Sequence, residues 1–198
     1  MMPEHRSTFA VGLACVFCLA AATAGCVRTQ SAEIRHRAEV AEREHEPQLL
    51  VARAKAFAEI GDYTRAEQYI DAARLSGAPE RQLLSLLLEV CIKDQRYRAA
   101  VQHTEDYLRK RPSEYRLRYM LASLHLALGE PEPARRELET VLRFAPTHAE
   151  AHYSLAVLLR DSLGEPQAAD AHFREYLRLA PRGLHTQEAA DSLLERMP

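Results

Sequence analysis

The sequence of 198 residues predicts an all-α fold, an α-solenoid of about four helix–turn–helix units with a capping helix at its C-terminal end. Two observations support this prediction. Alanines recur 34, 34 and 35 residues apart, and each is followed 12 or 13 residues later by a proline. These pairs are Ala66 and Pro79, Ala100 and Pro112, Ala134 and Pro146, and Ala169 and Pro181. In addition, no stretch alternates apolar and polar residues as a strand of a half-buried sheet would.

Residues 1–25 predict an export signal. The uncharged stretch 9–25 ends in small side chains and is shorter than the about 20 apolar residues that span a bilayer. The next feature, Thr23-Ala24-Gly25-Cys26, resembles the lipobox of bacterial lipoproteins. That resemblance implies cleavage before Cys26 and acylation of its thiol. An ordinary signal peptide and a short uncleaved anchor are the alternatives.

The lipobox resemblance also implies a location. Two or three acyl chains on Cys26 bind a bilayer stably, where one chain would not. Val27 would be the second mature residue, whereas inner-membrane retention usually requires aspartate there. We therefore expect a lipid-anchored protein in the cell envelope, at the outer membrane and facing the periplasm. With Cys15 and Cys18 in the signal, Cys91 is left as a lone core thiol, and no disulfide is expected.

Residues 26–46 predict a charged linker that is helical in part. The stretch is rich in Ala, Glu and Arg, and opposite charges at helical spacing support a helix. Its apolar stripe is thin, so we expect a spacer between the lipid and the solenoid. It could rest on the first unit near Arg53.

The four units are expected at residues 47–79, 80–113, 114–147 and 148–182. In each unit a first helix runs to a turn and a second helix runs to the proline, which cannot continue it. Small residues should stand where the two backbones come closest. The alanine after each turn meets this need, and so do Ala54, Ala122 and Ala156. Because one helix pair cannot bury its own apolar stripe, the pairs must stack on one another.

These positions resemble the tetratricopeptide repeat over about two thirds of the chain. The first unit matches at Leu50, Ala54, Phe57, Gly61, Tyr63, Ala66, Ile70 and Ala73. The second matches at Leu84, Leu87, Tyr97, Ala100 and Pro112. The third and fourth match at Leu121, Ala122, Gly129, Ala134, Leu138 and Pro146, and at Leu155, Ala156, Gly164, Ala169, Phe173 and Pro181. The departures are Arg53, Arg118, His152, a late Pro79 and one extra residue before Gly164.

Residues 183–198 predict the capping helix, with Thr186 as a candidate N-cap. Its apolar face comprises Ala189, Ala190, Leu193, Leu194 and Met197. A terminal element with a polar outer side is what a solenoid needs.

Little in the sequence indicates catalysis. His148 and His152 have a spacing that metals use, but no third ligand is indicated, and His152 falls on a packing position. The chain has no phosphate-cradling glycine loop, and its formal charge of -2 gives no reason to expect nucleic acid. We expect no enzyme, no cofactor, no metal and no small-molecule substrate.

The resemblance implies that function lies in a concave groove lined by the first helices, at the second, fifth, ninth and twelfth places of each unit. In the first two units these residues are Gln48, Val51, Lys55 and Ala58, then Gln82, Ser85, Glu89 and Ile92. In the last two they are Arg116, Tyr119, Ser123 and Leu126, then Glu150, Tyr153, Val157 and Arg160. Tyr119 and Tyr153 share one place in neighbouring units and are expected to stack along the groove near Arg116 and Arg160. Alternatively, both tyrosines fill the space between units.

The expected partner is a protein segment, extended or helical, held in this groove. Because the chain contains no asparagine, the carboxylate clamp of the chaperone-tail-binding subfamily is not expected. The combination of signal, lipobox and consecutive repeats is similar to the pilotins of type IV pili, which assist secretin assembly. The alternatives are an accessory lipoprotein of outer-membrane β-barrel assembly and a structural adaptor of peptidoglycan or cell-envelope machinery.

Overall fold

The computed structural model describes residues 46–194, and all regular structure within them is helical. The predicted signal, Cys26 and all of the spacer except Glu46 lie outside the described residues, as do residues 195–198. The first two helix pairs are α2 (Pro47–Glu59) with α3 (Tyr63–Leu75) and α4 (Glu80–Lys93) with α5 (Tyr97–Lys110). The next two are α6 (Tyr115–Ala127) with α7 (Pro131–Phe144) and α8 (Ala149–Asp161) with α9 (Pro166–Leu179), followed by α10 (Thr186–Asp191).

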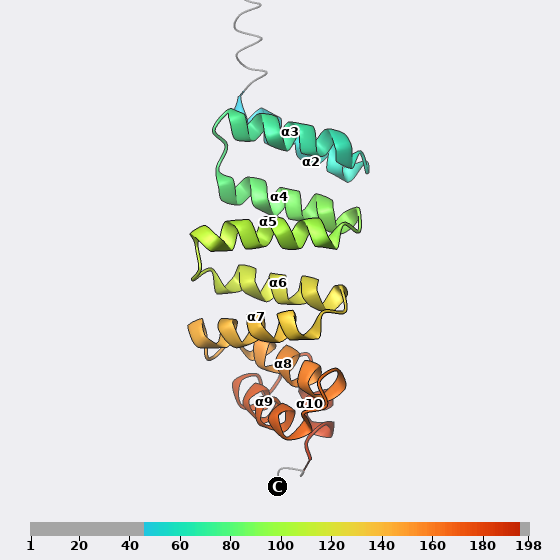
Figure 1. Cartoon of the computed structure of the whole chain (residues 1–198), viewed down its shortest axis with the longest axis vertical. Helices are drawn as coiled ribbons and strands as arrows, with labels where there is room; N and C mark the ends of the chain where they lie inside the picture. The colour runs from blue at the N-terminus through green and yellow to red at the C-terminus, as the bar shows by residue number, and fades with distance from the viewer. Residues whose placement is uncertain (1–45, 195–198) are drawn as a thin grey trace, which may run out of the picture.

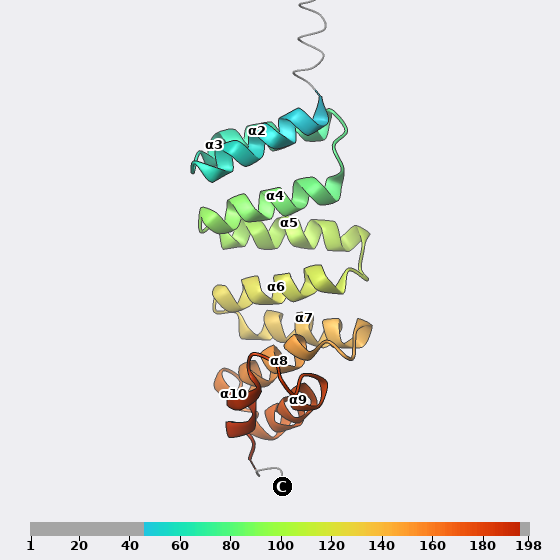
Figure 2. The ribbon, with the colours of Figure 1, turned by 180° about the vertical axis from the view of Figure 1, so that it is seen from behind.

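The helix pairs stack in chain order along the long axis of the molecule (Figure 1), and the reverse view shows the same order (Figure 2). Each helix lies against the next one in sequence, and α2 also contacts α4, the first helix of the next unit. The predicted fold class, an all-α solenoid of four paired-helix units, is confirmed.

Alanines allow the close approach of helices within a unit. Ala54, Ala66, Ala134 and Ala156 are all fully buried at the contacts between paired helices. The second unit differs, because Leu88 stands where the other units have a small residue. In that unit α4 and α5 approach each other less closely than the two helices of the other pairs. A larger side chain at the contact gives a physical reason for the wider spacing.

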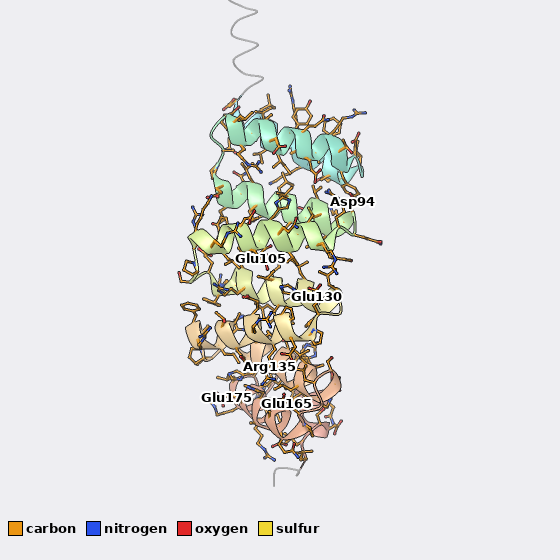
Figure 3. The ribbon with its side chains drawn as sticks, viewed as in Figure 1. Asp94, Glu105, Glu130, Arg135, Glu165 and Glu175 are labelled. Atoms are coloured by element: carbon orange, nitrogen blue, oxygen red, sulfur yellow. The ribbon has the colours of Figure 1, made fainter. Side chains whose placement is uncertain are left out.

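Ion pairs join the start of one second helix to the turn of the next unit. Arg96 bonds to Glu67 at 2.5 Å and Arg98 to Glu130 at 3.0 Å. Arg135 of α7 bonds to Glu165 at 2.8 Å, and both are labelled in Figure 3. Exposed pairs of this kind contribute at most about 1 kcal/mol each. Their main effect is therefore on the register between units.

The capping helix is shorter than the sequence predicts. It begins at Thr186, as expected, but ends at Asp191, and residues 192–194 form a turn. The expectation that Thr186 caps the helix was wrong. His185 is the N-cap residue, and the Thr186 hydroxyl lies within hydrogen-bond distance of the carbonyls of Ala180 and Gly183. A threonine that satisfies these upstream carbonyls anchors the cap to the end of α9.

Candidate functional site

The first helices α2, α4, α6 and α8 supply the residues expected to line the groove, and we call the surface of these residues the groove face. Side chains on it that are exposed to solvent are Gln48, Lys55, Ser85, Glu89, Ile92, Arg116, Ser123 and Leu126. Those that are half-buried are Gln82, Tyr119, Glu150, Tyr153, Val157 and Arg160. Most of the predicted residues therefore reach the surface.

Two predicted groove residues belong to the core instead. Val51 is 3% exposed and Ala58 is also buried. Both lie in the same apolar cluster as Leu83 and Leu87 of α4, so they help to pack the first unit against the second. Neither side chain is available to a partner.

The fourth unit's part of the groove face is covered by the cap. The Tyr153 ring stacks on His185 with ring centroids 3.9 Å apart, and its hydroxyl donates to Glu188 at 2.6 Å. Burial, together with the Glu188 carboxylate, raises the pKa of the Tyr153 hydroxyl, which stays protonated and donating. Arg160 donates to the Ser192 hydroxyl at 2.5 Å. The cap residues thus occupy the contacts that a partner would have made here.

Tyr119 is used between units in the same way. Its hydroxyl shares a hydrogen bond with Ser154 at 2.9 Å, and its ring lies 5.0 Å from that of His148. Arg160 lies near Tyr153, as expected, since both contact the Glu188 carboxylate, at 3.8 and 2.6 Å, and it also lies over the Phe173 ring. Arg116 lies over the ring of Tyr115. The alternative interpretation, that these tyrosines fill the space between units, matches these contacts.

The groove face of the first three units carries two basic side chains that form no ion pair with the described residues. Glu89 pairs with Lys93 at 2.7 Å, one helical turn further on. Lys55 and Arg116 are exposed, and neither has an acidic partner within residues 46–194. The available charge on this part of the face is therefore positive.

A hollow of about 180 Å³ opens on the groove face between α4 and α6. The residues that line it are Arg81, Leu84, Ser85, Leu88, Tyr107, Glu114, Arg116, Leu117 and Met120. Two of these, Ser85 and Arg116, are among the predicted groove residues. Sequence reasoning missed the remainder, although Leu88 at a small-residue place was a signal that could have found it.

The histidine pair with metal-like spacing does not form a site. His148 is the N-cap of α8, and its Nδ1 accepts from the Ala151 amide at 3.2 Å. His152 faces away from it, with Nδ1 at 3.0 Å from Nδ1 of His172 and Nε2 at 2.9 Å from the Pro146 carbonyl. No group of three or more histidine, cysteine or acidic side chains suited to a metal occurs in the described part of the chain.

Cys91 is buried in α4, as expected of a core residue. Burial raises the pKa of its thiol, so the reactive thiolate is disfavoured. Within residues 46–194, no helix combines the length and apolar character needed to cross a bilayer.

Stacked helix pairs with an exposed inner face define a helical-repeat scaffold for protein interactions. Models of the tetratricopeptide repeat match residues 51–115, 92–159 and 149–182, which together span two thirds of the chain. The chain belongs to the tetratricopeptide-repeat family, whose members are generally non-enzymatic scaffolds.

Solved structures show the same fold. The crystal structure of MamA protein aligns with a TM-score of 0.62 and 17% identity, over 76% of this chain and 79% of that one. YrrB, described as a repeat protein with an unusual peptide-binding site, aligns with a TM-score of 0.60 and 15% identity, over 75% and 76%. A repeat protein from Parabacteroides merdae aligns with a TM-score of 0.65 and 23% identity, over 74% and 58%.

Curated relatives match only part of the chain. Aryl-hydrocarbon-interacting protein-like 1 of Mus musculus and that of Rattus norvegicus are each 31% identical over 91 residues. This match covers 44% of the present chain and spans 28% of the relatives' length. The chain therefore spans less than a third of the length of these relatives.

Proposed function

We propose that this protein is a lipid-anchored scaffold of the bacterial cell envelope that binds a segment of a partner protein on the groove face of its first three units. The observation that supports this proposal most directly is the presence there of exposed cationic and apolar side chains. Lys55 and Arg116 have no acidic partner among the described residues, and Ile92 and Leu126 are 37% and 39% exposed. A protein segment that has both acidic and apolar side chains can bind such a surface.

Tyrosine and arginine often dominate binding energy in interfaces, but Tyr153 and Arg160 already bind the cap. Partner contacts are therefore assigned to the first three units. The binding surface is made of preformed helices, so a partner would bind with little reordering of this chain.

Site-directed crosslinking in cells tests the groove assignment. A photo-reactive amino acid at Ser123, which is exposed on α6, should capture a partner protein. The same group at Arg136, exposed on α7, is the matched control. Equal capture from both positions, or capture only from α7, would show that the groove face is not the binding surface.

The lipid anchor is supported by Thr23-Ala24-Gly25-Cys26, which resembles a lipobox. Cys26→Ser should release the protein from membranes and abolish the incorporation of radiolabelled acyl chains. Cys18→Ser, in the same segment, should leave both unchanged. Acyl labelling that persists in the Cys26→Ser protein would rule out this anchor.

For the partner system we propose outer-membrane secretin assembly of the type IV pilus, as for the pilotins that the architecture resembles. The accessory role in β-barrel assembly and the adaptor role in peptidoglycan machinery remain the alternatives. Identifying the protein captured at Ser123 separates them, because a secretin, a barrel-assembly subunit and a peptidoglycan enzyme are different products.

A further inference from the structure

We propose that the hollow between α4 and α6 is a specificity pocket, which takes one apolar side chain of a partner segment while Arg116 binds an acidic residue beside it. This inference rests on the proposed function, because it names the chemistry of the segment that the groove face binds. It does not depend on the envelope location.

The floor of the hollow is buried and apolar. Leu84, Leu88 and Tyr107 are 9%, 2% and 6% exposed. The volume of about 180 Å³ can be compared with a known cavity of roughly 150 Å³, lined by apolar side chains, that binds benzene. One leucine or phenylalanine side chain therefore fits the space.

The hollow arises from the sequence of the second unit. Leu88 of α4 and Tyr107 of α5 both line the hollow, at the places where the first unit has Ala54 and Ala73. The first unit's helices close on these small residues, whereas α4 and α5 stay further apart. The hollow lies beside these two helices, on the side that faces α6.

The rim of the hollow suits an adaptable contact. Met120 is 40% exposed, and Leu117 beside it is half-buried. Methionine is flexible and polarisable, so it adjusts to the shape of an incoming side chain. Seating a partner residue here would remove apolar surface of both chains from water.

The charge at the rim selects an acidic neighbour. Arg81 donates from one nitrogen to both oxygens of Glu114, at 3.1 and 3.0 Å, and so neutralises the one rim carboxylate. Arg116 is exposed and has no acidic partner in residues 46–194, so the rim carries one net positive charge. A guanidinium can bind a carboxylate through two parallel hydrogen bonds. The matching ligand is an acidic residue adjacent to a leucine or phenylalanine.

The probe for this proposal is a phage-displayed library of 12-residue peptides, selected on the full-length protein in detergent. We expect the selected peptides to carry leucine or phenylalanine next to aspartate or glutamate. A selected peptide without an acidic residue, or with no large apolar one, would overturn the assignment of ligand chemistry.

Two variants and two matched controls then locate the selected peptide. Ser85→Trp should close the mouth of the hollow and weaken binding about tenfold or more. Arg136→Trp, which places the same ring on the exposed face of α7, should not. Arg116→Glu should weaken binding, whereas Arg136→Glu, with the same charge change on α7, should not. A peptide whose acidic residues are replaced by lysine should bind the Arg116→Glu protein better than the wild type.

The outcomes separate this inference from the proposed function. Unchanged binding in Ser85→Trp together with weakened binding in Arg116→Glu would leave groove binding intact and overturn the pocket. Equal binding to all four variants would overturn both. The spacer also contains acidic residues before aliphatic ones, at Glu33-Ile34 and Glu39-Val40. If the peptide binds only after residues 31–45 are replaced by a Gly-Ser linker, the occupant is this chain's own segment, and the partner assignment is overturned.

Discussion

Gln95→Gly is expected to stabilise the protein, although it removes a side chain. Gln95 follows the end of α4 with φ of 56°, in the left-handed region. Its amide donates to the Ile92 carbonyl at 3.0 Å, and the next amide, of Arg96, donates to the Cys91 carbonyl at 2.8 Å. This bonding pattern ends a helix and favours glycine at this position. The first and third units make the same pair of bonds around Gly61 and Gly129, with φ of 80° and 69°.

The magnitude follows from two opposing terms. A residue with a Cβ pays roughly 1–2 kcal/mol for the left-handed conformation, which glycine adopts freely. Glycine also increases the freedom of the unfolded chain, which offsets about 0.4–1 kcal/mol of that gain. The net stabilisation should be about 0.5–1 kcal/mol. At a slope of about 2 kcal/mol per molar urea, the unfolding midpoint should rise by roughly 0.3–0.5 M.

The assay is urea unfolding followed by circular dichroism, with two controls. Gln102→Gly lies in the exposed interior of α5 and should lower the free energy of unfolding by about 1 kcal/mol. Gly129→Gln should destabilise through the backbone alone, because no atom lies within 4 Å of a Cβ added there. If Gln95→Gly lowers the midpoint as Gln102→Gly does, the assignment of backbone strain to Gln95 is wrong.

Three further predictions address the core. Leu88→Ala should lower the free energy of unfolding by about 2–4 kcal/mol, although the other units have alanine at this place, because it leaves a cavity; an unchanged urea midpoint would contradict the packing described. Burial and the neighbouring His152 lower the pKa of His172, so the unfolded state takes up this proton at a higher pH than the folded state does. Stability should therefore drop as pH falls through about 6.5. Unfolding at pH 7.5 and 5.5 should show a smaller loss in His172→Gln, and equal losses would argue against this cause. The Cys91 thiol should be alkylated only as the chain unfolds, and mass spectrometry of its peptide would expose any labelling of the native state.

The sequence predicted the helix pairs because their signals are local and repeated. Prolines end the second helices, and buried alanines such as Ala66 and Ala134 mark the contacts within a unit. These features depend on backbone geometry alone, so they can be read at each unit independently. The length of the cap could not be read in this way, since Thr186 makes its hydrogen bonds to the loop before it.

The candidate site was predicted only in part because exposure depends on neighbouring units. The position of a residue within its repeat correctly predicted that Ser85 and Arg116 are exposed. It could not predict that Val51 is buried in an apolar cluster with residues of α4. It also could not show that Tyr153 is bound by the cap, because the residues that bind it belong to no repeat. The hollow depends on the distance between α4 and α5. This distance is a property of the helix pair, and the sequence of either helix alone does not indicate it.

The second unit departs from the repeat pattern at its helix contact and at its turn, and this has a physical consequence. Leu88 and Tyr107 stand where the first unit has Ala54 and Ala73, and Gln95 replaces glycine at the turn. A unit that follows the pattern closes its helices on alanine and leaves no space for a ligand, so the most regular units are the least able to bind in this way. Residues whose local conformational or packing preferences conflict with the fold tend to occur at functional positions. The same reasoning predicts opposite results for two changes toward the pattern. Gln95→Gly relieves strain away from the hollow and should leave peptide binding unchanged, whereas Leu88→Ala removes part of the hollow's floor and should weaken both folding and binding.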